Sequence, residues 1–243
     1  LPHAFLAACD RQRAIAMDEG MGTETGAARQ RIQSGKPTGQ AIQSASQAFA
    51  EVLLGLAVDL NRLNNRALPV GMVQVARYAD PQNSAASVLL ALLFESQDRS
   101  EEALRILSTI PLTDPLAPQA RDATARILID SKRAQEAYAL AREASSAPGA
   151  SVSDFARLGD VLYSMEQYHQ SADAYGQAIA RTAAQGLTTE QWPLHLLRAT
   201  ALESADRWDE AKQAFQAGLA ITPEQPQLLN FYGYAKLERG EDL

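Results

Sequence analysis

Three histidines, His3, His169 and His195, are the side chains in this sequence best suited to acid-base or metal chemistry near neutral pH. No His-x-x-x-His spacing occurs, and the one Glu-x-x-His spacing, Glu166 with His169, falls at an expected interhelix turn, so it does not place two metal ligands on one face of a helix. The single cysteine, Cys9, excludes an internal disulfide and a thiolate-rich metal site. We therefore predict solvent or packing roles for the histidines, and we predict no catalytic residue, metal site or cofactor.

A glycine-rich segment and two short basic clusters have only part of the pattern that binds phosphate or nucleic acid. The glycines of GMGTETG, residues 20–26, are spaced G-x-G-x-x-x-G and no apolar strand precedes them, so an interhelix loop is favoured. The basic clusters Lys132/Arg133 and Arg29/Arg31 lack interleaved aromatic residues and are expected on solvated faces. Carboxylate pairs of the glycosidase kind are not excluded, because an acidic chain offers many pairs whose separation the sequence does not give.

The composition indicates a folded, acidic protein. The chain has 243 residues, 46% of them apolar, and its 22 basic and 29 acidic residues give a net charge of −7. This charge disfavours nucleic acid and anionic membranes as partners. The longest apolar run, residues 88–94, is far shorter than the roughly 20 residues of a membrane-spanning helix, so no span is predicted. The compartment stays open: we expect a soluble protein, cytoplasmic, or periplasmic if a signal peptide has been removed.

A spacing of 34 residues relates small and apolar positions along most of the chain. Ala103 and Ala137 stand 68 and 34 positions before Ser171 in this register. Toward the C-terminus the interval stretches to 40, which reaches Ala211, and then returns to 34. With Gly159 taken as position 8 of a unit, a small residue recurs at position 8, Ala at 20, an aromatic residue at 24, Ala at 27 and Pro at 32.

This helix-turn-helix unit resembles the tetratricopeptide repeat, in an Ala-rich form of a bacterial type. The resemblance predicts an all-α fold, a right-handed superhelix (α-solenoid) of stacked helix-turn-helix units. The units are expected at about 50–81, 84–115, 118–147, 152–186 and 192–223, followed by a truncated unit at 226–243. Residues 1–45 do not keep the register, and we expect them to form an N-terminal helical cap or a degenerate repeat.

Packing explains the pattern independently of the family, because two antiparallel helices approach closely only where small side chains lie at their contact. The small residues expected there are Gly159, Ala178, Ala211 and Gly233. The aromatic residues expected to fill the core are Tyr168, Tyr175, Trp208 and Phe215. Three pairs have capping-box spacing ahead of first helices: Ser151 with Asp154, Thr188 with Gln191, and Thr222 with Gln225.

The resemblance also implies a function, since the first helices of such repeats line an extended groove that binds a peptide or helix. Positions 2, 5, 9, 12 and 13 of each first helix face that groove. The predicted partner groove consists of Leu54, Val58, Leu92, Asp122, Arg126, Asp160, Tyr163, Thr200, Asn230 and Tyr234. It runs from an apolar end to a polar, acidic end, where Tyr163 and Tyr234 are the strongest contact candidates. At the apolar end, a cover formed by residues 1–45 is the alternative to an exposed patch.

Two features of the sequence bear on the kind of partner that the groove would bind and on the C-terminal end of the array. Co-chaperone members of the family hold a C-terminal carboxylate with Lys, Asn and Arg on the first helices, and Ser153, Ala156, Arg157 and Asp160 do not reproduce that clamp. Leu243 stands where a second helix would begin, so we expect that the natural protein continues, or that this end packs on another copy as a homo-oligomer. The leading interpretation is a non-catalytic scaffold for an unidentified protein or peptide. A non-catalytic accessory domain of a larger enzyme and a self-associating structural protein remain alternatives.

Overall fold

The computed structural model describes residues 44–63, 68–184 and 191–241. In these ranges the chain forms eleven α-helices and no strand, which confirms the predicted all-α solenoid of stacked helical hairpins. The chain divides into two compact units after Phe49, and the fold described below is that of the second unit, Ala50–Leu243. Among the described helices, none has the length and apolar character needed to cross a membrane.

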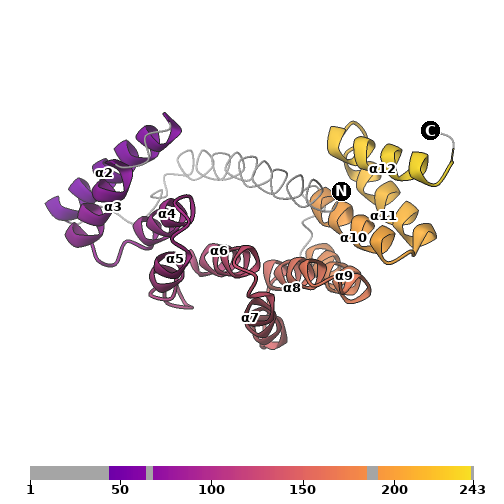
Figure 1. Cartoon of the computed structure of the whole chain (residues 1–243), viewed down its shortest axis with the longest axis horizontal. Helices are drawn as coiled ribbons and strands as arrows, with labels where there is room; N and C mark the ends of the chain where they lie inside the picture. The colour runs from indigo at the N-terminus through magenta and orange to yellow at the C-terminus, as the bar shows by residue number, and fades with distance from the viewer. Residues whose placement is uncertain (1–43, 64–67, 185–190, 242–243) are drawn as a thin grey trace. The chain divides into compact units, whose positions relative to one another are not determined.

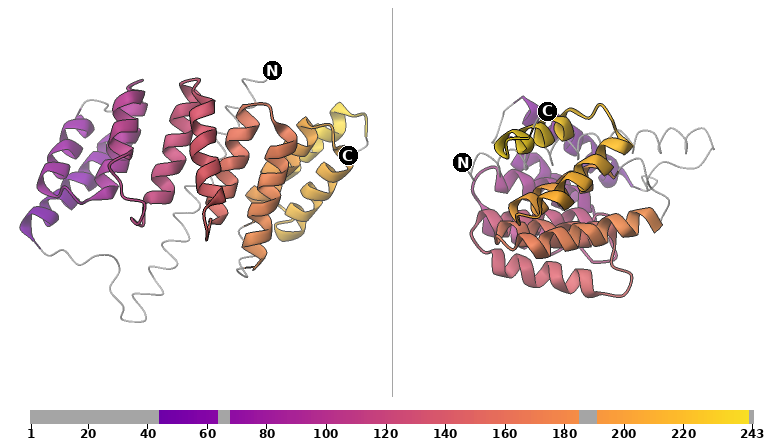
Figure 2. Two further views of the ribbon diagram at one scale, coloured as in Figure 1. Left: turned by 90° about the horizontal axis from the view of Figure 1, so that it is seen from below. Right: turned by 90° about the vertical axis from the view of Figure 1, so that its right-hand side faces the viewer.

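The helices follow one another as hairpins (Figure 1). They are α2 (Ala45–Arg62) with α3 (Leu68–Ala79), α4 (Ser84–Glu95) with α5 (Ser100–Leu107), α6 (Ala117–Asp130) with α7 (Ala134–Ser146), α8 (Val152–Ser164) with α9 (Tyr168–Ala184), and α10 (Trp192–Ser204) with α11 (Trp208–Ile221), followed by α12 (Pro226–Glu238). The second helix of each hairpin packs on the first helix of the next, from α3 on α4 to α11 on α12 (Figure 2). The buried residues accordingly form successive clusters along the stack.

The recurring small residues lie where the two helices of a hairpin meet. A Cβ atom on Gly159 would lie 2.6 Å from Cε1 of Tyr175 on the facing helix, so only glycine leaves room for that ring. The Ser171 hydroxyl donates to the Gly159 carbonyl at 2.7 Å and fixes the same contact. Equivalent buried positions in the other hairpins are Ala57, Ala91, Ala125 and Ala199 at position 8, and Ala103, Ala137 and Ala211 at position 20.

The predicted aromatic core is confirmed at position 24 of the last two complete hairpins. Tyr175 and Phe215 are 2% and 1% exposed. The two aromatic residues at position 17, Tyr168 and Trp208, are only half-buried. They stand at the first residue of α9 and of α11, where a helix end leaves one side of the ring uncovered.

The four hairpin turns from α4–α5 to α10–α11, and the turn after α12, each contain one residue with a left-handed backbone, a feature that the sequence pattern did not predict. These residues have φ angles of 56° to 69° and are spaced by 34, 34, 40 and 34 positions, like the sequence repeat. They are Asp98, Lys132, Glu166, Asp206 and Gly240. In each turn the next N–H donates to the carbonyl five residues earlier, as Gln167 N does to Leu162 O at 2.9 Å. This bond defines a Schellman motif, whose left-handed residue is usually glycine.

Of the three predicted capping boxes, the one at Thr188 lies outside the described residues, and the other two have different outcomes. The capping box of α8 is confirmed: Ser151 Oγ accepts from the Asp154 N–H, and the Asp154 carboxylate accepts from the Ser151 N–H at 2.9 Å. The capping box at Thr222 is wrong, because Thr222 is the C-cap of α11, and α12 begins at Pro226 after Gln225. Proline supplies the helical φ angle at that first position, so α12 starts three residues later than the spacing suggested.

Replacing Gly159 tests the close contact between the helices. We expect Gly159→Ala to lower the free energy of unfolding by about 1 to 2 kcal/mol, because the new methyl group overlaps the Tyr175 ring. Gly71→Ala is the matched control, since a Cβ there meets nothing within 4 Å. The control should gain about 0.5 to 1 kcal/mol from helix propensity alone. Urea unfolding followed by circular dichroism measures both, and equal effects of the two substitutions contradict the steric explanation.

Replacing Glu166 tests the left-handed turn. We expect Glu166→Gly to raise the free energy of unfolding by about 1 kcal/mol, because glycine adopts a positive φ without the clash of a Cβ atom. In the interior of α9, Gln177→Gly should instead cost about 1 kcal/mol. The same urea titration compares the two variants, and a loss of stability in Glu166→Gly contradicts this account of the turn.

Candidate functional site

The predicted partner groove lies mainly on the first helices of the hairpins. These are α4, α6, α8, α10 and α12, and we call the surface that they present the first-helix face. Helix α4 packs on α6 and α6 packs on α8, so first helices of successive hairpins touch one another directly. Polar groups that bond from one first helix to the next are therefore not free to bind a partner on this face.

A bidentate ion pair joins α6 to α4. Arg126 donates through Nε and Nη2 to the two carboxylate oxygens of Glu95, at 2.9 and 2.7 Å. Both side chains are about three-quarters buried, so the pair is largely shielded from solvent. Arg126 was predicted to contact a partner, and in the structure its guanidinium is already occupied by this neighbouring helix.

A second and more buried network joins α8 to α6. Arg157 is 2% exposed, and it donates to Asp122 through Nε at 2.8 Å and to Asp154 through Nη1 at 2.9 Å. Its Nη2 also donates to the Pro118 carbonyl at 3.2 Å. A buried guanidinium needs such partners, because an unpaired charge inside a protein is strongly destabilising. Asp122, another predicted groove residue, is thus part of the contact between two hairpins.

The same network lowers the pKa of Asp154. Burial raises the pKa of this carboxyl, but hydrogen bonds from Ser151 and Arg157 and the positive charge of Arg121 outweigh burial. The net pKa lies below its usual value, and the carboxylate stays ionised in the folded protein. Asp154 therefore serves two roles at once, as the acidic member of the capping box of α8 and as a partner of the buried arginine.

The two groove residues predicted on α8 contact different helices: Asp160 contacts α9, and Tyr163 contacts α10. The Tyr175 hydroxyl of α9 donates to Asp160 at 2.7 Å, within the hairpin. The Tyr163 hydroxyl lies 3.1 Å from Ser204 Oγ on α10, across to the next hairpin, and its ring meets Tyr168 edge-on at 5.1 Å. Tyr163 is half-buried and presents one edge to solvent.

The C-terminal part of the first-helix face is acidic and aromatic. Burial, together with the nearby Glu238, raises the pKa of Glu203 on α10, while the positive charge of Arg239 opposes this shift. Tyr234 on α12 is 60% exposed. A hydrogen bond with Glu238, and the negative charge of that residue, raise the pKa of the Tyr234 hydroxyl. Two carboxyl groups and one accessible ring thus lie close together on α10 and α12.

The structure does not gather the ten predicted groove residues into one site. Leu54 is buried in the core cluster shared by α2, α3 and α4, and Thr200 is buried in α10. Val58 is half-buried, and Leu92 is 38% exposed on α4. Asn230 and Tyr234 are exposed on α12. Of the remaining four, Asp122, Arg126 and Tyr163 bond to neighbouring first helices. Asp160 accepts a hydrogen bond from Tyr175 within its own hairpin.

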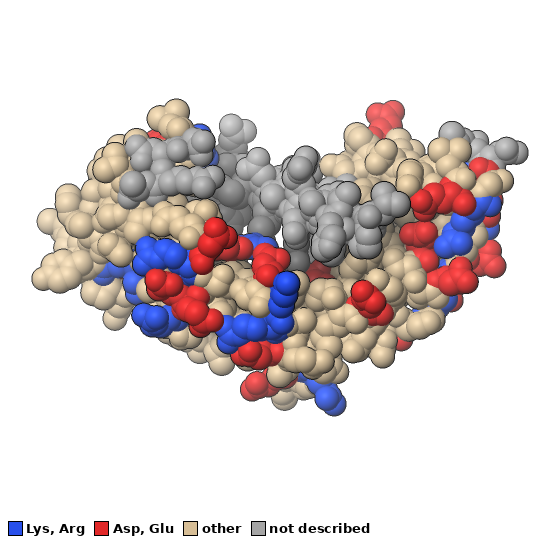
Figure 3. All heavy atoms as spheres, in the orientation of Figure 1, with Lys and Arg blue, Asp and Glu red and all other residues tan. Residues whose placement is uncertain are grey.

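Sequence reasoning missed the residues that pair with Arg126, Asp122 and Tyr163. Glu95, Arg157 and Ser204 lie 31 to 41 positions from their partners, which is about one repeat. Charged residues of opposite sign separated by one repeat were the available signal. On the face of the molecule shown in Figure 3, basic and acidic side chains lie next to one another rather than in large patches of one sign.

The residues considered for catalysis are not assembled in the described part of the chain. His169 is exposed, and the half-buried His195 has an Nδ1 atom without a hydrogen-bond partner. Burial and the nearby Arg198 lower the pKa of His195. No group of three His, Cys, Asp or Glu side chains within the described ranges could hold a metal ion. His3, Cys9 and the GMGTETG loop lie outside those ranges.

Comparison with known proteins agrees with the hairpin geometry. The sequence profile of the tetratricopeptide repeat matches residues 73–127, and solved tetratricopeptide proteins superpose on the stack. The described hairpins therefore have the fold of tetratricopeptide repeats. A thermophilic protein of this kind, TTC0263 from Thermus thermophilus, is 18% identical, covers 77% of this chain and 99% of its own length, and gives a TM-score of 0.57.

Two further solved structures resemble the tetratricopeptide array. The pilF protein of Pseudomonas aeruginosa is 17% identical over 82% of this chain and 87% of its own, with a TM-score of 0.58. MamA from Desulfovibrio magneticus is 12% identical over 76% and 99%, with a TM-score of 0.53. At these identities the likeness concerns the fold. No curated protein sequence matches the chain.

The buried network predicts a specific response to acid. Because the pKa of Asp154 is lower in the folded protein than in the unfolded chain, its stabilisation is present above about pH 4 and is lost as the pH falls through the folded pKa. We expect Asp154→Asn to cost about 3 kcal/mol near neutral pH, since it leaves a buried arginine underpaired. The variant should then lose less stability than the wild type between about pH 6 and pH 3.

Urea titrations at the two pH values measure this difference. Asp173→Asn is the control, because Asp173 is exposed and its contact with Arg207 is long, at 3.7 Å. The control should follow the wild type at both pH values. Equal acid sensitivity of Asp154→Asn and the wild type contradicts the role assigned to Asp154.

Proposed function

We propose that this protein is a non-catalytic scaffold that binds a peptide or helix of a partner protein on its first-helix face. The observation that carries the proposal is the arrangement of α12. Asn230, Tyr234 and Leu237 occur at i, i+4 and i+7 and are all exposed, whereas Leu228 and Ala235 are buried on the opposite side of the helix. Residues with this spacing form one stripe, which an amphipathic helix or an extended peptide can cover.

The chemistry of the stripe suggests the kind of partner. A tyrosine ring and a leucine offer apolar contact area, and tyrosine adds a hydroxyl at little cost in side-chain entropy. Glu238 places negative charge beside them, whereas Glu203 on α10 is paired with Arg239 at 3.5 Å. A partner segment with an apolar anchor and a lysine or arginine complements this surface. The ion pairs between α4, α6 and α8 support the proposal in another way, because they hold α8, which carries Tyr163, in a fixed position.

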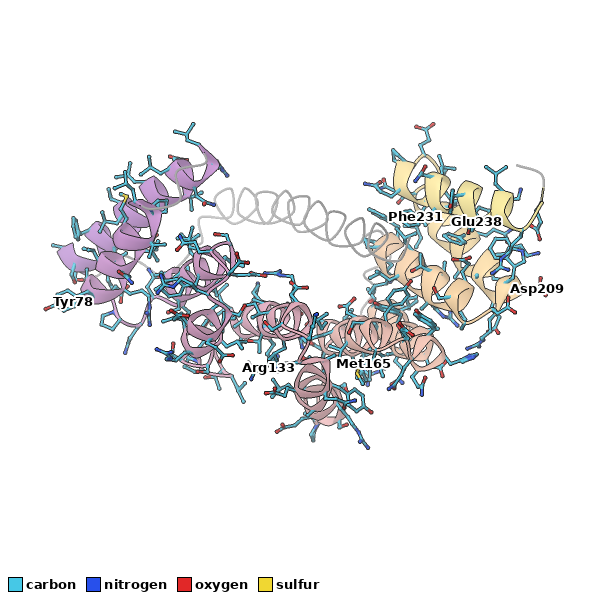
Figure 4. All side chains as sticks on the ribbon, viewed as in Figure 1. Tyr78, Arg133, Met165, Asp209, Phe231 and Glu238 are labelled. Atoms are coloured by element: carbon cyan, nitrogen blue, oxygen red, sulfur yellow. The ribbon has the colours of Figure 1, made fainter. Side chains whose placement is uncertain are left out.

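Two tyrosines on the first-helix face and one elsewhere provide a matched experiment. The immobilised chain is exposed to an extract of its source cells, and captured proteins are quantified by mass spectrometry for the wild type, Tyr163→Ala and Tyr234→Ala. Tyr78→Ala is the control, because Tyr78 is 89% exposed and extends outward from α3, a second helix (Figure 4). Truncating a central contact typically costs about 2 kcal/mol, so we expect the two test variants to retain about tenfold less partner.

The outcomes separate the competing functions. A partner that the wild type and Tyr78→Ala retain, and that Tyr163→Ala or Tyr234→Ala loses, supports binding on the first-helix face. Equal retention by all four proteins contradicts this assignment. If the captured protein is another copy of this chain, the self-associating alternative replaces the proposed one. Photo-crosslinking from position 234 then identifies the partner segment that contacts α12.

A further inference from the structure

A cleft of about 590 Å³ lies between the second helices α7 and α9, away from the contact residues named above. Its floor is formed by Phe155, Leu158 and Leu162 of α8. Helix α7 contributes Arg142 to one wall, and α9 contributes Arg181 to the other. The volume falls within the range of about 300 to 1,000 Å³ that is typical of ligand sites.

The two arginines of this cleft differ from most others in the described part of the chain, because neither forms an ion pair there. Arg133 and Arg207, by contrast, each lie 2.6 Å from a glutamate three residues later. The Arg181 guanidinium stacks over the Phe155 ring at 3.7 Å, an arrangement that leaves the N–H groups at its edge able to bind an anion. The cleft thus holds two arginines that form no ion pair within the described residues, in a chain whose net charge is −7.

The carboxylate at the rim of the cleft does not neutralise these charges. Asp173 of α9 lines the cleft, but its side chain is 71% exposed and its ionic contact is with Arg207, which lies in the turn before α11. The polar rim is otherwise formed by uncharged side chains such as Gln170 and Gln177. The cleft therefore combines an apolar floor with a basic rim.

We propose that this cleft binds an acidic peptide segment, which places an apolar side chain against the floor and a neighbouring carboxylate between Arg142 and Arg181. Guanidinium groups bind carboxylates through paired N–H donors, and they do so most strongly where solvent is partly excluded. Nucleic acid is disfavoured as the occupant, because its backbone would meet the acidic remainder of the chain. This site is separate from the first-helix face, whose acidic C-terminal part complements a basic segment.

The experiment uses defined peptides and isothermal titration calorimetry. The probe is an acetylated hexapeptide in which glutamate and leucine alternate. One counterpart carries glutamine in place of glutamate, and another carries alanine in place of leucine. We expect the probe to bind about tenfold more tightly than either counterpart, and its affinity to fall as salt is added. Arg142→Gln and Arg181→Gln should each weaken binding of the probe by about fivefold to tenfold.

Matched variants make the result specific. Arg105→Gln removes an exposed arginine of α5 outside the cleft, and we expect it to leave the affinity unchanged. Tyr234→Ala should also leave it unchanged, so that the outcome is independent of binding on the first-helix face. Circular dichroism verifies that each variant keeps its helix content. Equal binding of the glutamate and glutamine peptides, no binding of the probe, or a loss of affinity in Tyr234→Ala but not in the two arginine variants each overturns the proposal.

Discussion

The stack depends on how closely two helices of one hairpin can approach. At Gly159 the distance is set by the Tyr175 ring, which occupies the space that any side chain at position 159 would need. The alanines at the same position of other hairpins are buried in the same way, with smaller facing residues such as Leu107 and Ala141 in place of the tyrosine. The smallest residue on the first helix, glycine, thus faces the largest of these side chains on the second helix, tyrosine. This local match lets a hairpin form, but it leaves apolar surface that only the next hairpin covers.

The link between hairpins is more polar than the contact within a hairpin. Arg126 with Glu95, and Arg157 with Asp122, join first helices that are one repeat apart. Replacing such ion pairs by apolar residues of similar size often costs little stability, so their value lies at least as much in the register that they impose. A guanidinium that must reach one carboxylate holds its helix at one position along the neighbour. The first-helix face therefore has a defined geometry over α4, α6 and α8, while the end of α12 is joined to α10 through Arg239 and Glu203, 3.5 Å apart.

The two proposed binding surfaces differ in sign and position. The C-terminal part of the first-helix face carries Glu203 and Glu238 beside Tyr234, whereas the cleft over α8 carries two arginines without ion pairs in the described residues. Helix α8 contributes to both proposed surfaces, because its opposite sides carry different residues. Tyr163 belongs to the first-helix face, and Leu158 to the floor of the cleft. A scaffold with two such surfaces can hold two segments of opposite charge.

The sequence by itself determined the elements and their order, because the 34-residue spacing of small and aromatic residues reflects contacts within a hairpin, between residues close in the chain. The cap at Ser151 was readable for the same reason. The left-handed turn at Glu166 was not readable, since the hydrogen bonds of the turn impose that conformation on a residue that does not favour it. Only the tertiary structure decided that Leu54 and Thr200 are buried, that Arg126 and Asp122 bond to neighbouring helices, and that Arg142 and Arg181 border one cleft. Those outcomes depend on the rotation and distance between successive hairpins, and the pattern within one repeat does not specify either quantity.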